Sequence, residues 1–568
     1  MKHSLLFVFL LFTWFGTTRT AQAQLPMQPV AFSSGGYDNV ISATYDAQGR
    51  LYLIGHMGFN QNTASPTPPA IRTASGNTTL DNGFNSGTYF IAVYGPTGQL
   101  EKMHPYYMGY GGTLRSIAVD QAGNIYLTGT ESQYTFMVRK INRTFQTLWT
   151  LTQGTNGGAW GNKVLVDAQG NVYVAGTSQS WSMFGLTMRQ RSCCLENDFL
   201  IKVNAQGTLQ WIRAGLGGPN DLITDSSANS IAFDRAGNVV MVGTLSGTGT
   251  YGNLTLSGGS GNIIAVKYNP TGNVLWGRVY GNATYPSRGS TQAMDVATDE
   301  ADNLYICGNF YGPQQFGTVT LNTASYYRDA LLLKLNSEGT PLWARAGGYT
   351  AGTNLSASAY ASVAYRDGKI KVAGYSQSTP GLYESNPVVA SYEANGRFAW
   401  ATNLRPGTVA TGNKILIDEN QTSHVFGFFK NTFQIGATAF PSYGGQQDAF
   451  YVQVLDSARY GASCLIRGTL YQDANRDCRL GSGELGLGGI IVEALPGPRY
   501  GITDSLGRYL IATDTGRYTV RALLPQRPGQ QITPLCPASG VSDTLYFPTP
   551  GASSQAWILD MSSTLPRT

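Results

Sequence analysis

Short stretches of alternating apolar and polar residues recur along the chain, each followed by a tight turn and an apolar stretch ending in Gly. Period-two alternation over about four to eight residues predicts β-strands, and turns carrying Asp, Asn and Gly predict hairpins between them. Seven copies of this first unit occur: "YDAQGRLYLIG" from Tyr45, "VDQAGNIYLTG" from Val119, "VDAQGNVYVAG" from Val166, "FDRAGNVVMVG" from Phe233, "TDEADNLYICG" from Thr298, "YRDGKIKVAG" from Tyr365 and "IDENQTSHVFG" from Ile417.

A second unit follows each copy and consists of an apolar strand, a turn and usually Trp. It is clearest in "FLIKVNAQGTLQW", "IIAVKYNPTGNVLW" and "ALLLKLNSEGTPLW", with weaker copies near Phe90, Phe136, Pro387 and Ala449. Each pair of units encodes four short strands. Four antiparallel strands repeated every 45–75 residues, roughly, are typical of a propeller blade. The sequence therefore predicts an all-β fold with a seven-bladed β-propeller over residues 24–460.

The repeated pattern, D-x-x-G-N-x-Y-x-x-G followed by D-x-F-x-x-K…G…W, resembles the SBBP-type repeats of exported bacterial proteins over residues 27–457. The resemblance implies a seven-bladed ring. The last copy ends near Asp456 without an outer strand, whereas an unassigned apolar stretch stands at residues 27–34. We expect residues 27–34 to complete the last blade, which would remove an open sheet edge.

Two sets of residues recur in one register of the repeat. The Trp residues suit packing between blades better than a cofactor site, which would not need symmetric copies. The Asp residues suit turn formation better than catalysis. The sets are Trp149, Trp211, Trp276, Trp343 and Trp400, and Asp46, Asp120, Asp167, Asp234, Asp299 and Asp418.

Long connections between the units should emerge on the face opposite the short turns, and function on a rigid propeller is usually carried by such loops. They span 56–88, 104–114, 177–197, 245–261, 309–328 and 375–386. Exposed aromatic residues there could stack on a glycan or bind an extracellular protein, or they could simply pin their own loops. The candidates for ligand binding are Trp181, Tyr326, Tyr327 and Tyr349. Further aromatic residues in or near the connections between units are Trp160, Tyr251, Tyr285 and Tyr443.

From Cys464 the pattern changes to "CLIRGTLYQDANRDCRLGSGELGLGGIIVEALPG". Asp473, Asn475, Asp477 and Glu484 occupy positions 1, 3, 5 and 12 of a twelve-residue loop, and the Arg479 carbonyl stands at position 7. This is the ligand spacing of a calcium loop of the EF-hand type, although Cys replaces the Gly usual at position 6. The alternative is a polar turn that binds no metal.

Strands flank this loop, and the arrangement resembles the calcium-binding B-type repeats of serine–aspartate adhesins and, more loosely, the transthyretin-like regulatory domain of carboxypeptidases. The resemblance covers about residues 464–525 and implies an immunoglobulin-like or transthyretin-like β-sandwich, within residues 461–568, that calcium stiffens as a spacer. Cys464, Cys478 and Cys536 lie in this module, and Cys478–Cys536 is the pair we favour. Cys193 and Cys194 are adjacent, so a strained bond between them is disfavoured.

The N-terminus and the composition bear on location and partners. A short apolar run and the Ala-x-Ala pattern ending at Ala23 predict a signal peptide, residues 1–23, and a secreted or cell-surface protein. A membrane anchor is the alternative, but the run is too short to cross about 30 Å of hydrocarbon. Charged residues make up 12% and no Lys/Arg run occurs, which argues against nucleic acid as a partner. We expect a monomer.

Catalysis leaves little trace in the sequence. His56 and His424 fall in or beside predicted strands, where a structural role is favoured over that of a base. The chain has no G-x-S-x-G elbow, HExxH or P-loop. A binding or adhesion protein is therefore the favoured interpretation. A secreted carbohydrate-active enzyme is the alternative, because carboxylates brought together by folding leave no linear pattern.

Overall fold

The computed structural model describes residues 30–564 without 35, 59–69, 74–75, 80–87, 97, 181, 188–195, 218–223, 283–290, 323–327, 348–355, 378–384, 404–408, 420, 436–437, 443–446, 455–463, 478–480, 482–483, 488–489, 496–498, 504–506, 514–515, 524–532, 537–544 and 548–556. The predicted signal peptide, Cys193, Cys194 and Cys478 lie outside this part of the chain. The described residues form strands and no helix, so the all-β prediction is confirmed.

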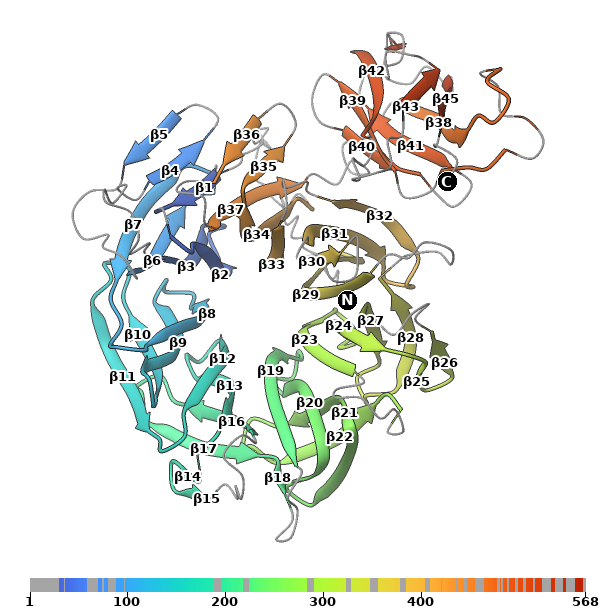
Figure 1. The fold of residues 1–568 in the computed structure, drawn as a ribbon. Coiled ribbons are helices and arrows are strands. Elements are labelled where there is room, and N and C mark those ends of the chain that lie inside the picture. The colour runs from blue at the N-terminus through green and yellow to red at the C-terminus, as the bar shows by residue number, and fades with distance from the viewer. Residues whose placement is uncertain are drawn as a thin grey trace, which may run out of the picture.

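The sheets are arranged around a common centre like propeller blades, with the first strand of each blade innermost (Figure 1). Five blades are separate sheets. These are β2 (Asn39–Tyr45), β3 (Leu51–Met57), β6 (Thr88–Tyr94) and β7 (Leu100–Tyr106); β8 (Thr113–Val119), β9 (Ile125–Ser132), β10 (Thr135–Ile141) and β11 (Thr147–Gly154); β12 (Ala159–Val166), β13 (Val172–Ser178), β16 (Asn197–Val203) and β17 (Leu209–Ala214); β19 (Asp225–Phe233), β20 (Val239–Tyr251), β21 (Leu254–Tyr268) and β22 (Val274–Tyr280), with β18 (Leu216–Gly217) added to β20; and β23 (Thr291–Thr298), β24 (Leu304–Tyr311), β27 (Arg328–Leu335) and β28 (Pro341–Ala346).

The predicted count of seven separate blades is wrong, because the last two repeats share one ten-stranded sheet. A single parallel pair, Ser385 with Val409, joins them, and the Ser385 hydroxyl also donates to the Ala410 carbonyl at 3.0 Å. The strands of this sheet are β29 (Ser356–Arg366), β30 (Lys369–Gln377), β31 (Ser385–Glu393), β32 (Phe398–Asn403), β33 (Val409–Ile417), β34 (Ser423–Lys430), β37 (Gln447–Val454), β1 (Val30–Ser33), β4 (Ala70–Thr73) and β5 (Gly76–Thr79).

The N-terminal strand closes the ring as predicted. β1 pairs antiparallel with β37, placing Phe32 opposite Ala449, and all four of its residues are buried. The Ser33 hydroxyl donates to Asp448 on β37 at 2.8 Å, and Arg72 forms an ion pair with the same carboxylate. The hairpin of β4 and β5 extends the sheet beyond β1, so β1 is not its outermost strand.

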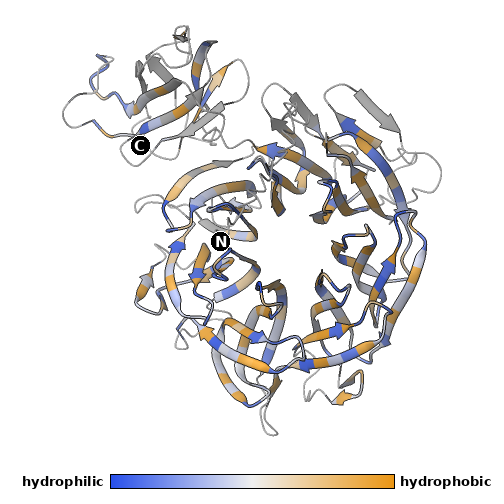
Figure 2. Cartoon of the chain, turned by 180° about the vertical axis from the view of Figure 1, so that it is seen from behind, coloured by the Kyte–Doolittle hydropathy of each residue, from blue (hydrophilic) through white to orange (hydrophobic). Residues whose placement is uncertain are grey.

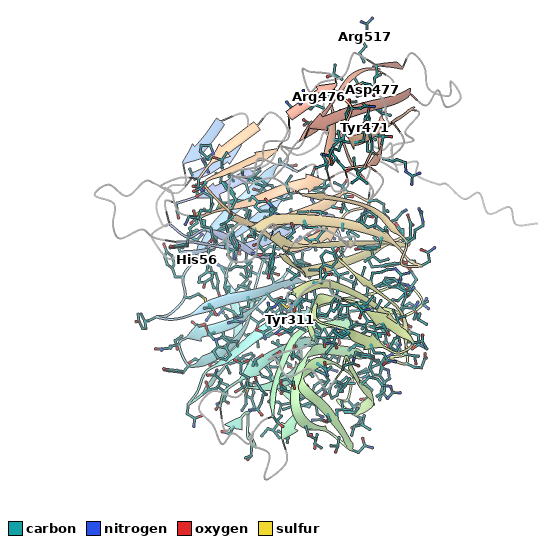
Figure 3. All side chains as sticks on the ribbon, turned by 45° about the vertical axis from the view of Figure 1, so that its right-hand side comes forward. His56, Tyr311, Tyr471, Arg476, Asp477 and Arg517 are labelled. Carbon is teal, nitrogen blue, oxygen red and sulfur yellow. The ribbon has the colours of Figure 1, made fainter. Side chains whose placement is uncertain are left out.

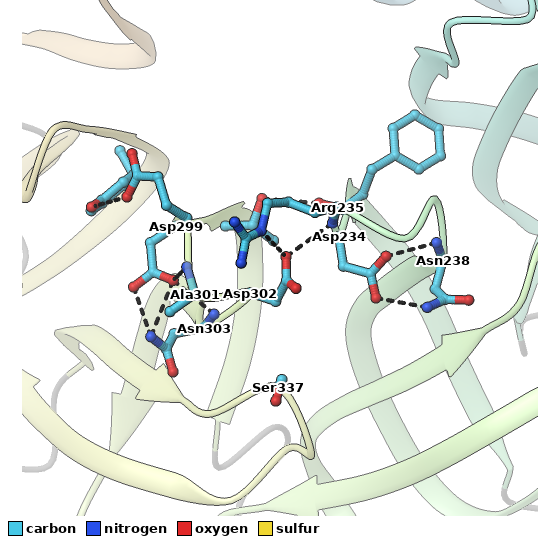
Figure 4. A network of polar contacts seen from close by, with 12 residues as sticks. Asp234, Arg235, Asn238, Asp299, Ala301, Asp302, Asn303 and Ser337 are labelled. Carbon is cyan, nitrogen blue, oxygen red and sulfur yellow. Dashed lines mark hydrogen bonds and ion pairs between the residues drawn. The ribbon is translucent and has the colours of Figure 1, made fainter. Parts of the chain in front are cut away.

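The repeated turns form because the Asp side chain binds the backbone of its own turn. Asp234 Oδ1 accepts a hydrogen bond from the backbone N–H of Asn238 at 2.8 Å, and Asp299 Oδ1 accepts one from the backbone N–H of Asn303 (Figure 4). The four other predicted turn Asp residues accept the N–H four positions on in the same way. The predicted role of these residues in turn formation is confirmed.

The Gly that ends the first repeat unit faces a bulge in the inner strand. A Cβ at Gly308 would lie 1.9 Å from the Gln292 carbonyl oxygen, which no side chain can tolerate. The bulge brings this carbonyl forward because one extra residue of β23 is inserted between Ala293 and Asp295. Glycine is therefore required at this position by close approach of the backbone.

Four of the five repeated Trp residues join neighbouring blades, as predicted, and the side chain of the fifth, Trp400, lies outside the described residues. The Trp149 indole N–H donates to the Ala205 carbonyl of the next blade at 3.0 Å, and the Trp276 N–H donates to Ser337 at 3.0 Å. Trp211 and Trp343 make the same contact with the turn of the following blade. Apolar and polar residues alternate along the strands that these contacts connect (Figure 2).

The C-terminal module has two four-stranded sheets with a common core. Ile466, Val492 and Tyr518 belong to one buried cluster that draws on both sheets. The sheets comprise β41 (Arg508–Thr513), β38 (Cys464–Gln472), β45 (Trp557–Thr564) and β43 (Thr533–Cys536), and β40 (Arg499–Ile502), β39 (Ile491–Leu495), β42 (Gly516–Leu523) and β44 (Leu545–Phe547). β40 contacts β32 of the ring (Figure 1). Within the described chain, no helix has the length and apolar character needed to span a membrane.

Candidate binding surface and calcium loop

One predicted long loop, 245–261, is a continuation of two strands. β20 runs on to Tyr251 and β21 starts at Leu254, so the prediction of a loop there is wrong. The Tyr251 ring is fully buried, and its hydroxyl donates to Asp198 Oδ2 at 2.6 Å. Burial raises the pKa of this Asp198 carboxyl. Tyr251 therefore pins its own segment and is not a surface aromatic residue.

Other long connections fold outward as small hairpins at the rim of the ring (Figure 1). Their apolar side chains cover the outer parts of the blades: Met183, Phe316 and Phe433 are each buried in a blade core. The hairpins are β14 (Ser182–Met183) with β15 (Leu186–Thr187), β25 (Gln314–Phe316) with β26 (Val319–Leu321), and β35 (Thr432–Ile435) with β36 (Thr438–Pro441). These connections are therefore long because their hairpins supply apolar side chains to the blade cores.

The four predicted ligand-binding residues, Trp181, Tyr326, Tyr327 and Tyr349, lie outside the described residues, so their role stays a prediction. Tyr285 and Tyr443 lie outside them too. Trp160 is described and half-buried, and the Arg115 guanidinium lies 5.7 Å from its ring centroid.

Three other tyrosines form an exposed group on the long-loop face, which we call the aromatic patch: Tyr107, Tyr110 and Tyr134. Their side chains are 57%, 91% and 51% exposed, respectively. Tyr107 and Tyr110 lie in the connection from β7 to β8, and Tyr134 lies in the turn between β9 and β10. The two segments adjoin, because the Gln133 N–H donates to the Tyr110 carbonyl at 3.1 Å.

The backbone beneath the aromatic patch is held at several points. The Gly109 N–H donates to the Glu131 carbonyl at 3.0 Å, which docks the connection onto β9. Arg139 on β10 donates to the Glu131 carboxylate and to the Tyr106 hydroxyl, both at 2.7 Å. The patch is therefore presented by a fixed framework. The connection 104–114 was predicted as a long loop, but its tyrosines were not predicted as a binding site, although the string "PYYMGYGG" contains three of them.

Two carboxylates meet on the same face where β16 and β19 begin. The Glu196 N–H donates to Asp225 Oδ1 at 2.9 Å, and Gln179 donates to the Glu196 carboxylate at 3.4 Å. Burial and the neighbouring Asp225 charge raise the pKa of Glu196, while Arg115 opposes the rise. A carboxyl with a raised pKa beside a second carboxyl is an arrangement suited to acid–base chemistry.

Two further features bear on catalysis. His424 is a structural residue as predicted: its ring is buried on β34, and Nδ1 lies 2.7 Å from the Tyr451 hydroxyl. An open recess of about 480 Å³ lies at the outer rim, where Arg345, Tyr392, Arg397 and Phe398 are among its lining residues. Among the described residues that line this recess there is no carboxylate and no His.

The predicted calcium loop begins at the end of β38, and its two ends pair with each other. The Gln472 N–H donates to the Leu485 carbonyl at 2.8 Å, and Tyr471 bridges Gly486. Figure 3 shows Tyr471 and Asp477 together in the C-terminal module, away from His56 on the ring. This pairing brings position 1 of the loop, Asp473, near position 12.

Four of the five predicted ligands are described, and hydrogen bonds link them into one turn. The Asp477 N–H donates to Asp473 Oδ1 at 3.2 Å and to Asn475 Oδ1 at 3.0 Å. Both Glu484 oxygens face the loop, because Oε1 accepts the Ala474 N–H at 2.9 Å and Oε2 accepts the Gly481 N–H at 2.7 Å.

These hard oxygen donors fit calcium by type. Arg479 lies outside the described residues, and among those described no three His, Cys, Asp or Glu side chains form a group that could hold a metal ion. Arg476, at position 4 of the loop, has a left-handed backbone with a φ of 62°, and Cys478 at position 6 lies outside the described residues.

No protein-family model matches the chain, and no curated protein matches it. Several solved structures are similar in fold only. A protein of unknown function from Dyadobacter fermentans is 9% identical with a TM-score of 0.36, the match covering 76% of this chain and 99% of that one. A protein of unknown function from Bacteroides caccae is 13% identical with a TM-score of 0.31, covering 55% and 89%. A glucose dehydrogenase is 10% identical with a TM-score of 0.30, covering 74% and 99%.

Proposed function

We propose that this chain is a secreted binding or adhesion protein whose aromatic patch engages a glycan or an extracellular protein. The observation that carries the proposal is the exposure of Tyr107, Tyr110 and Tyr134 on adjoining, hydrogen-bonded segments of a rigid ring. Tyrosine combines an apolar ring, which stacks on the faces of sugars or on other side chains, with a hydroxyl that bonds to polar groups. Such a residue loses little conformational entropy when it is bound.

The C-terminal module acts in this proposal as a two-sheet sandwich that calcium stiffens. Its loop offers the carboxylates of Asp473, Asp477 and Glu484, the Asn475 amide and the Arg479 carbonyl. Calcium bound there would cross-link the end of β38 to the segment after the loop, and the contact of β40 with β32 would hold the module beside the ring. The function of the module is then to space and orient the ring.

A secreted carbohydrate-active enzyme is the second candidate, and the pair Glu196 and Asp225 is the observation that favours it. The raised pKa of Glu196 suits a general acid, and the neighbouring carboxylate would then act as base or nucleophile. We rank this function lower because Asp225 accepts the Glu196 backbone N–H, which is a structural use of the second carboxylate.

The binding proposal is tested by probing arrays of glycans and matrix proteins with the purified full-length chain. We expect selective binding that falls at least tenfold in Tyr110→Ala and Tyr134→Ala. Phe398→Ala removes an aromatic residue at the outer rim that is as exposed as Tyr134, and it is the control. Binding that survives both tyrosine changes would overturn the proposal. Polysaccharide cleavage that disappears in Glu196→Gln would establish the enzyme instead.

The calcium proposal is tested by melting the full-length chain with and without millimolar calcium. A dissociation constant of roughly 10⁻⁴–10⁻³ M would stabilise the module by about 0.5–1.5 kcal/mol at such concentrations. Asp473→Asn and Glu484→Gln should abolish the calcium-dependent shift. Glu338→Gln, which changes an exposed carboxylate on the ring, should retain it. If calorimetry of the wild-type chain shows no heat of calcium binding, the loop is a polar turn that binds no metal, and the proposal is wrong.

A further inference from the structure

Charged residues meet at the centre of the ring. Each inner strand carries a bulge at the same level, and the residue after the bulge stands four positions before the turn of the repeat. These residues are Ser42, Ser116, Lys163, Ser230, Asp295, Ser362 and Lys414. Serine is the common choice, and the charged exceptions come from β12, β23 and β33, which are the innermost strands of their blades (Figure 1).

Asp295 is the hub of this group, and its side chain is only 7% exposed. Its Oδ1 accepts the Ser230 hydroxyl at 2.6 Å, and its Oδ2 accepts the Ser362 hydroxyl at 2.8 Å. The Lys414 ammonium donates to Oδ2 at 3.0 Å, whereas the Lys163 nitrogen stays 3.7 Å from Oδ1. The carboxylate is thus saturated by other donors, and the contact with Lys163 is too long for a normal hydrogen bond.

The charges of the group do not balance. Two ammonium groups share one carboxylate, and the charged groups that act on Lys163 are Asp295 and Lys414. Burial together with the like charge of Lys414 lowers the pKa of Lys163 to about 8. Burial alone would raise the pKa of Asp295, but the two ammonium groups hold it well below its usual range. The carboxylate therefore stays ionised, and an excess positive charge remains at neutral pH.

A buried charge without a counterion is costly, and a small anion would remove that cost. Each ammonium offers three N–H donors, of which Asp295 takes at most one. The side chains of Lys163 and Lys414 are 19% and 12% exposed, so small solutes can reach them. We propose that Lys163 and Lys414 form a binding site at the centre of the ring for a small oxyanion, a carboxylate or a phosphate.

Binding of an oxyanion at this site must be coupled to protonation of Lys163. An oxyanion stabilises the charged form of Lys163, so the complex requires its proton and affinity should fall as pH rises through about 8. Asp295 repels an anion, and its neutralisation should therefore strengthen binding.

The experiment uses the full-length chain with inorganic phosphate or acetate, each balanced by sodium chloride to constant ionic strength. We expect a saturable rise in melting temperature at pH 7 with one of the two probes, which then identifies the class of oxyanion. The affinity should fall at least fivefold between pH 7 and pH 9. An equal effect of chloride, or no saturable effect of either probe, would overturn the proposal.

Variants locate the site. Lys163→Met and Lys414→Met should abolish the response, and Asp295→Asn should increase affinity several-fold. Lys102→Met is the matched control, since it removes the same charge from an exposed position on β7 and should bind normally. If the methionine variants do not fold, Lys163→Arg keeps the charge. Its fixed guanidinium charge should remove the fall in affinity between pH 7 and pH 9, and an unchanged pH dependence in this variant would refute the site.

Discussion

Truncation of Phe32 tests the closure of the ring. This side chain is fully buried on β1, stacks on Phe90 with ring centroids 5.2 Å apart, and stands opposite Ala449 of the last repeat. Phe→Ala changes at such sites cost about 3–5 kcal/mol. The ring spans Val30 to Val454, about 425 residues, for which the entropy of unfolding is about 0.9 kcal/mol/K. Phe32→Ala should therefore lower the melting temperature by about 3–6 °C.

The assay is differential scanning calorimetry of the full-length chain. Leu148→Ala is the control, because this side chain is half exposed on the outer strand β11 and should change the melting temperature by less than about 1 °C. If both variants melt like the wild type, β1 does not contribute to the stability of the ring, and the inferred closure is wrong.

Three further predictions concern the ring. Gly308→Ala should destabilise it by several kcal/mol in chemical denaturation, whereas Gly154→Ala, whose Cβ would meet no atom within 4 Å, should be nearly neutral. Burial raises the pKa of Asp38 to about 8, so between about pH 4 and pH 8 the folded state holds a proton that the unfolded chain has released. The free energy of unfolding should therefore fall as pH rises from 4 to 8. Asp38→Asn should flatten this part of a stability–pH profile. Trp343→Phe should cost about 1 kcal/mol at equilibrium, because it loses the indole N–H bond to the next blade.

The sequence predicted those features that depend on neighbouring residues. The turn Asp and the Gly at the end of each first unit belong to short patterns whose geometry is local, and the structure confirms the turns. The Trp contacts and the pairing of β1 with β37 are long-range, but repetition revealed them. A residue that recurs in one register must meet the same neighbour in each blade.

The predictions failed where the repeat gives no information. Hairpins such as β14–β15 and β25–β26 have strands of two or three residues, too short to show alternation, so they were expected as loops. The bridge between Ser385 and Val409 depends on how two blades abut. The meeting of Lys163 with Asp295 depends on closure of the whole ring, and the only sequence signal is a charged residue where other copies have Ser.

The pairing of β1 with β37 also determines when the ring can be completed. A ribosome makes β1 before β37, and the β37 partner follows more than 400 residues later. At about 5–20 residues per second, β1 waits roughly 20–80 s for that partner. During this time an apolar strand, Val-Ala-Phe-Ser, has no native neighbour on its β37 side. We therefore expect a binding partner that covers β1 during synthesis to raise the yield of folded protein.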